Sequence, residues 1–114
     1  MHKRDKNLFL EDILESINAI EDYIKYIDFE DFKKDRKTYQ AVIREFEIIG
    51  EATKNIYKDL KEIYPTYPWR RIIDFRNKIS HEYFGIDFAF LWNTSFDKLP
   101  ELKKIIQKLI KEGI

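Results

Sequence analysis

The sequence predicts an all-α protein, an up-and-down bundle of four to five helices joined by short loops. Apolar residues recur at spacings of three and four along most of the chain, the period of an amphipathic helix. Only three Gly and three Pro interrupt that pattern, and neither sustained alternation nor an Asn-Gly or Asp-Gly hairpin signal occurs. A length of 114 residues suits one core, so we expect a single domain over residues 1–114.

The first helix is predicted to run to about Asp28, with Asp5 or Asn7 as its N-cap. Acidic residues such as Glu11 and Glu15 fall away from the apolar stripe and are expected to face solvent. The stripe itself recurs at spacings of three and four: Leu10, Ile13, Leu14, Ile17, Ile20, Ile24 and Ile27.

The second helix is predicted to follow a charged connection, residues 28–37, and to continue to about Leu60. Asp28, Asp31 and Asp35 are suitable caps for a short turn and for this helix. Gly50 lies inside the pattern, where glycine costs about 1 kcal/mol relative to alanine. An interior glycine of this kind is typical of a place where two helices approach closely.

Proline and glycine delimit the third helix. Pro65 ends the second helix, and Pro68 suits the first turn of the next one, which is expected over residues 69–84. Gly85 then follows as the expected C-cap.

Two further helices are predicted in the C-terminal part. Asp87 can cap a fourth helix over residues 88–99. Pro100 ends that helix and opens a fifth, residues 101–112, with its apolar residues on one side.

The composition excludes several classes of protein. A hydrophobic content of 44%, with 16% aromatic residues, argues against disorder. The chain has no Cys, which removes disulfide scaffolds and Cys-ligated zinc, and its two His are 79 positions apart, so no metal site is expected. No apolar run has membrane-spanning length and no signal peptide begins the chain, so we expect a cytoplasmic protein that does not contact membranes.

The charge balance bears on nucleic-acid binding. Twenty-one basic residues offset 21 acidic ones, giving a formal net charge of zero. This argues against a broad basic coat on nucleic acid, but it leaves room for a local site.

The predicted third helix carries the polar residues best suited to catalysis. Arg76 and Tyr83 are seven positions apart and share a face, as do Asn77 and His81, which are four apart. Arg76 and His81 lie about 140° apart around the axis and about 7.5 Å along it, so a second chain would ease their convergence. Taken singly, each of these residues is more often structural: His81 as a hydrogen-bonding histidine near a helix end, Arg76 in a surface ion pair, and Tyr83 as a core-edge phenol.

The string RNKISHEY, residues 76–83, fits the Arg-x4-His-x-Tyr motif of HEPN-domain proteins, and it resembles the HepT branch in particular. Three further blocks resemble that branch in order and spacing: residues 41–52, residues 67–87, and Trp92 with residues 99–106. The resemblance covers nearly the whole chain, and no position inside the motif departs from it.

This resemblance implies a HEPN-type bundle that forms homodimers, with the two motif copies near the interface. It also implies a metal-independent endoribonuclease that is the toxin of a toxin–antitoxin pair, with Arg76 and His81 as catalytic residues. The implied partner is a minimal nucleotidyltransferase of the MntA type, which transfers AMP from ATP to the motif tyrosine, here Tyr83. ATP would serve the partner, and this chain itself would need no cofactor.

These residue types suit RNA cleavage. The 2′-hydroxyl of RNA can attack the adjacent phosphate, which gives a 2′,3′-cyclic phosphate. His81, with a reference pKa of about 6.5, can act as base or acid, and Arg76 can hold the phosphate oxygens. Asn77 could orient His81 or contact the backbone. Arg70 and Arg71 could guide phosphate or be the solvated start of a helix.

Three functions therefore compete. The intact motif favours a ribonuclease toxin that acts on RNA. The neutral charge leaves room for a non-catalytic HEPN binding module that partners a nucleotidyltransferase. The third alternative is a helical assembly domain without a ligand.

Overall fold

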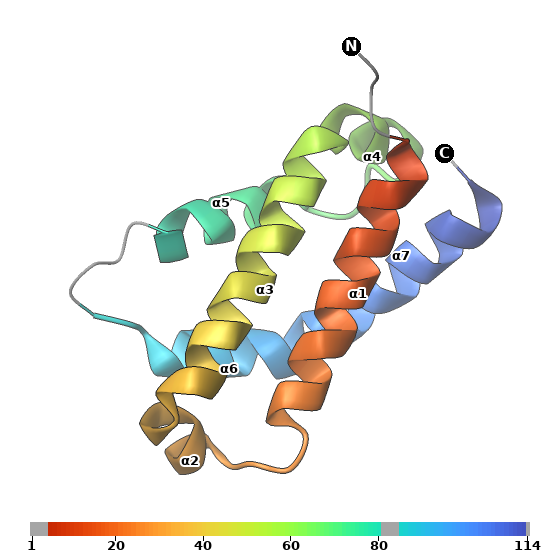
Figure 1. The fold of residues 1–114 in the computed structure, drawn as a ribbon. Coiled ribbons are helices and arrows are strands. Elements are labelled where there is room, and N and C mark those ends of the chain that lie inside the picture. Colours follow the sequence, from red (N-terminus) through yellow and green to blue (C-terminus); the bar gives the residue numbers. More distant parts are fainter. Residues whose placement is uncertain (1–4, 81–84, 114) are drawn as a thin grey trace.

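The computed structural model describes residues 5–80 and 85–113, which form seven helices and contain no strand (Figure 1). The all-α prediction is therefore confirmed for this part of the chain. In order, the helices are α1 (Lys6–Ile24), α2 (Phe29–Lys34), α3 (Arg36–Asn55), α4 (Tyr57–Ile63), α5 (Trp69–Ser80), α6 (Phe88–Asp97) and α7 (Leu99–Glu112).

Aspartates begin four of these helices, as the sequence predicted. Asp5, Asp28, Asp35 and Asp87 each accept a hydrogen bond from a backbone N–H two or three residues further on, at 2.8–3.1 Å. Each carboxylate thus accepts a hydrogen bond from one of the free amides of a first helical turn, and its negative charge interacts favourably with the positive end of the helix dipole. Of the two candidates for α1, Asp5 rather than Asn7 is the cap.

The bundle is built around α1 and α3, which run antiparallel and side by side (Figure 1). Helix α7 packs against α1, and α5 packs against α3. The apolar stripes of these helices meet in one hydrophobic cluster. Its members with no exposed surface are Leu10, Ile13, Ile17, Ile20, Phe32, Val42, Leu60 and Ile106.

Several predicted boundaries were wrong. Helix α1 ends at Ile24 rather than near Asp28, and Asp31 lies inside α2 instead of capping a helix. The long second helix is interrupted at Ile56, where φ is −119° and ψ is 21°, and α4 begins after it. Ile56 is buried, so core packing sets this break and no Gly or Pro marks it.

The end of the third predicted helix, residues 81–84, lies outside the described residues. The prediction that Gly85 is its C-cap therefore stays a prediction, whereas Gly113 has a positive φ of 79° at the end of α7. Helix α6 ends at Asp97 and α7 starts at Leu99, so Pro100 lies in the first turn of α7.

The interior glycine Gly50 lies where α3 and α5 approach each other closely. A Cβ atom on Gly50 would overlap the Cβ and Cγ atoms of Arg76. The predicted close helix contact is therefore confirmed, and its partner is the motif arginine.

None of the described helices combines the length and the apolar character needed to cross a membrane.

Candidate active site

The candidate site is centred on Arg76, in the middle of α5. Its aliphatic root lies against Gly50 of α3, so the side chain leaves the helix contact in a fixed direction. Its guanidinium then reaches two acceptors: Nη1 donates to Oδ1 of Asn77 at 3.1 Å, and Nη2 pairs with Oε2 of Glu51 at 3.4 Å. The side chain remains 32% exposed, so part of it is accessible to a ligand.

Arg76 forms one wall of a small cavity of about 210 Å³ between α1, α3 and α5. Its cationic lining residues are Arg44 and Arg76, and its carboxylates are Asp12, Glu47 and Glu51. By formal charge this lining is acidic by one unit. No group of three or more His, Asp or Glu side chains within residues 5–80 and 85–113 is placed to hold a metal ion.

The Arg76–Glu51 pair is of the weak kind. Glu51 is 54% exposed, and exposed ion pairs contribute about 0–1 kcal/mol. An incoming RNA phosphodiester has one negative charge shared by two non-bridging oxygens, and it can take the place of this weakly held carboxylate on the guanidinium. The Nε atom of Arg76 is buried and makes no hydrogen bond within the described part of the chain. Within the described residues, the guanidinium is thus held by Asn77 and Glu51 while its Nε donor has no partner.

The other predicted site residues are distributed over different surroundings. Asn77 lies beside Arg76 and accepts its hydrogen bond, so in this structure it orients the arginine. Arg70 is exposed and pairs with Asp74 at 3.3 Å on the solvent side of α5. Arg71 is directed to a different cavity, between α5 and the α6–α7 segment.

His81 and Tyr83 lie outside the described residues. Their roles as proton-transfer and modification residues therefore stay predictions from the motif.

Sequence reasoning missed Glu51 and Asn55. Glu51 follows Gly50, so the glycine that admits Arg76 also brings this carboxylate to it. Asn55 lines the same cavity one turn later, and its Nδ2 donates to the Glu51 carbonyl oxygen at 2.9 Å. The signal available in the sequence was the interior Gly followed at once by an acid, but a partner 25 positions away could not be assigned without the fold.

The fold and the site together define a class: all-α bundle proteins whose motif arginine is set against a glycine of a neighbouring helix. Comparison with known proteins gives the family. The sequence model of the family described as "HepT-like: Ribonuclease HepT-like" matches residues 13–109, and the chain belongs to this family.

Similar proteins extend over the whole chain. A protein named "Probable ribonuclease HepT" from Thermococcus cleftensis is 49% identical over 109 residues, which cover 96% of this chain and 99% of the relative. "Putative RNase MJ0127" from Methanocaldococcus jannaschii is 42% identical over 98% of this chain and 93% of its own length. "Putative RNase TTE0752" from Caldanaerobacter subterraneus is 38% identical over 91% of this chain and 93% of its own length. No solved structure matches the chain.

Proposed function

We propose that this protein is an endoribonuclease that cleaves RNA by transesterification, with Arg76 and His81 as its catalytic residues. The observation that carries the proposal is the placement of Arg76: its root lies against Gly50 and its side chain remains 32% exposed. The intact motif and the ribonuclease names of relatives up to 49% identical support it.

The proposed reaction divides the work between two side chains. The RNA 2′-oxygen attacks the adjacent phosphorus, the bond to the 5′-oxygen breaks, and the products are a 2′,3′-cyclic phosphate and a 5′-hydroxyl. Arg76 holds the non-bridging oxygens, whose negative charge grows in the transition state. His81 takes the 2′-proton or supplies the proton to the 5′-oxygen, since an imidazole titrates near neutral pH. No metal ion or cofactor of this chain is required by this step.

Nuclease activity is tested by incubating the purified protein with RNA in EDTA. We expect the parent to cleave, and Arg76→Ala and His81→Ala to lose cleavage while keeping the parent's circular dichroism spectrum. Arg70→Ala is the matched control, because Arg70 lies on the same helix but pairs with Asp74 away from the site. Equal cleavage by parent and Arg76→Ala would refute the assignment.

The proposal includes control by a partner. A nucleotidyltransferase of the MntA type would act as antitoxin: the Tyr83 oxygen attacks the α-phosphorus of ATP, AMP becomes attached, and pyrophosphate leaves with loss of the phenol proton. The motif spacing predicts that Arg76 and position 83 share a helix face, so the attached phosphate would then occupy Arg76. Tyr83→Phe is expected to cleave RNA as the parent does and to take up no AMP at this position.

Assembly and location complete the proposal. We place the protein in the cytoplasm as a homodimer with the two motif copies near the interface, which would bring Arg76 and His81 of different chains together. Sedimentation measurements test the dimer.

A second candidate function is favoured by the acidic lining of the Arg76 cavity. Carboxylates outnumber cations there, which opposes RNA and suits a non-catalytic HEPN module that partners a nucleotidyltransferase. Binding of the nucleotidyltransferase without cleavage of any RNA would support this alternative.

A further inference from the structure

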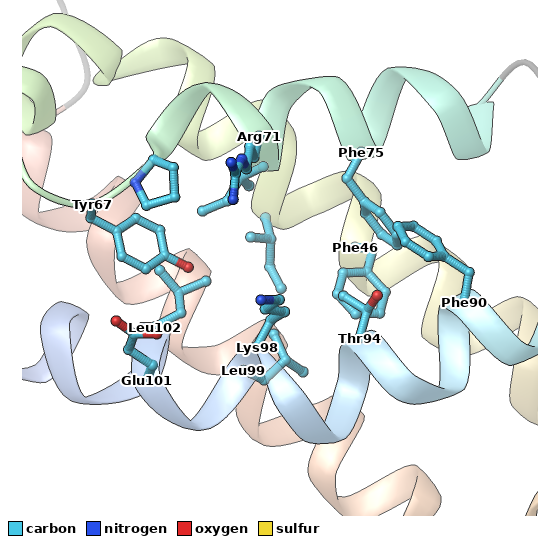
Figure 2. A pocket seen from close by; sticks show the side chains of 13 residues that line it. Phe46, Tyr67, Arg71, Phe75, Phe90, Thr94, Lys98, Leu99, Glu101 and Leu102 are labelled. Atoms are coloured by element: carbon cyan, nitrogen blue, oxygen red, sulfur yellow. The ribbon is translucent and has the colours of Figure 1, made fainter.

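A second cavity lies on a different side of α5 from the Arg76 cavity. It has a volume of about 320 Å³ and is enclosed by α3, α5, α6 and the start of α7 (Figure 2). This volume is at the lower end of the range of small-ligand sites, about 300–1,000 Å³, and suits one planar ring system. Its walls are mainly apolar and aromatic.

Two phenylalanine rings lie at one end of this cavity. Phe75 of α5 and Phe90 of α6 face each other, with ring centroids 5.3 Å apart, and Figure 2 shows both rings at one end of the cavity. Phe75 is half-buried against Phe46, which lies at the back of the cavity. Phe90 is 43% exposed, so it offers part of a ring face to a ligand.

Cations surround these rings. Arg71 and Lys98 line the cavity from opposite helices, both are exposed, and neither forms an ion pair within the described residues. The Lys78 Nζ atom lies 4.6 Å from the centroid of the Phe90 ring. Glu101 is the one carboxylate among the lining residues, so the lining has two cations and one acid, and Lys78 adds a third cation beside Phe90.

The helix period aligns these groups. Arg71, Phe75 and Lys78 follow one another at spacings of four and three, so they form one stripe along α5. Arg76 is next to Phe75 in the chain but points about 100° away, toward α3. The stripe of Arg71, Phe75 and Lys78 and the motif arginine therefore lie on different faces of the same helix.

We propose that this cavity is a base-binding subsite for single-stranded RNA. One base would stack on Phe90 and Phe75, and the neighbouring phosphates would lie on Arg71, Lys78 and Lys98. Base stacking on aromatic rings combined with backbone contacts to cations is the usual chemistry of single-strand binding. The inference rests on the proposed nuclease function and deepens it, because the subsite would select which nucleotide precedes or follows the cleaved bond.

The excess of cations favours RNA over a second copy of this chain as the occupant. The chain as a whole is neutral, so a copy offers no general attraction to these three cations, whereas every nucleotide of RNA brings a phosphate.

The test measures fluorescence anisotropy with a short, labelled 2′-O-methyl RNA, which cannot be cleaved because its 2′-oxygen is blocked. Phe90→Ala is expected to weaken binding roughly five- to hundred-fold, the usual effect of removing a stacking ring. Phe96→Ala is the matched control: Phe96 is on the same helix and 48% exposed, but its ring contacts Trp92 instead of the cavity. Equal affinities of the two variants would overturn the proposal.

The cations are tested by the salt dependence of binding. Arg71→Ala is expected to reduce the slope of log affinity against log salt by about 0.7, the value for one phosphate contact to a single strand. Lys108→Ala, an exposed cation elsewhere on α7, should leave the slope unchanged. If Phe90→Ala changes the sedimentation of the protein and Arg71→Ala leaves the slope unchanged, the cavity is an interface between copies and the proposal is wrong.

The two proposals fail separately. A parent that binds the 2′-O-methyl RNA through Phe90 but cleaves no RNA would refute the nuclease and leave the subsite. A parent that cleaves RNA with the same KM as Phe90→Ala would refute the subsite and leave the nuclease.

Discussion

Gly50→Ala tests whether the contact between α3 and α5 positions Arg76. Alanine is the better helix former, so propensity alone would stabilise α3 by about 1 kcal/mol. The new methyl group, however, would overlap the Cβ and Cγ of Arg76, atoms that are tied to the α5 backbone and cannot move aside as a flexible tip would. Overpacking of this kind typically costs about 1–3 kcal/mol, and a contact this close belongs at the upper end.

The difference between these two effects is a net destabilisation of about 1–2 kcal/mol. Urea unfolding followed by circular dichroism measures it. Gly85→Ala is the matched control, because a Cβ there meets no atom of the described residues within 4 Å. It is expected to be neutral or slightly stabilising.

The same substitution has a functional consequence. If α5 moves away from α3 to admit the methyl group, Arg76 moves with it, and RNA cleavage should fall by more than the small loss of folded protein explains. An increase in stability for Gly50→Ala, as helix propensity predicts, would refute the argument that this contact positions the arginine.

Two further predictions concern pH. Burial, and then the Glu101 carboxylate, raises the pKa of Tyr67 from its ordinary value of 10.0 to about 12. The neutral phenol is therefore favoured by folding, so stability should be lost as pH rises from about 10 through 12, and Tyr67→Phe should remove that part of the alkaline transition. Hydrogen bonds from the Thr38 side chain and backbone lower the pKa of Asp35, so its stabilisation is present above the unfolded value near 3.9 and should disappear as pH falls through the lower folded value. Asp35→Ala should flatten the acid limb of the stability curve, and an unchanged limb would show that this cap does not contribute.

Local signals account for the parts of the fold that the sequence predicted. The four capping aspartates precede apolar stripes, and a cap depends only on residues within one turn. The break at Ile56 has no such local signal, because it falls at a buried isoleucine and neither Gly nor Pro adjoins it. Such boundaries depend on tertiary packing, which intrinsic helix propensities do not describe.

The site residues likewise fall into those that local spacing predicted and those that depend on tertiary contacts. The spacing within RNKISHEY identified Arg76 and Asn77 from one helix. Glu51 belongs to the site only because α5 packs across α3, a contact between distant parts of the chain. Phe75 and Phe90 could not be distinguished from core aromatics until the structure showed which ring is exposed.

The most direct test of the proposed chemistry replaces one atom of the substrate. The cleaved bond in an RNA oligonucleotide is mapped first, and the nucleotide on its 5′ side is then made 2′-deoxy while the rest stays RNA. Transesterification predicts that this oligonucleotide binds as before and is not cut at that bond, and that the unmodified RNA gives a 2′,3′-cyclic phosphate and a 5′-hydroxyl in EDTA. Cleavage of the 2′-deoxy bond, or products with a 5′-phosphate, would contradict an internal attack assisted by Arg76 and His81.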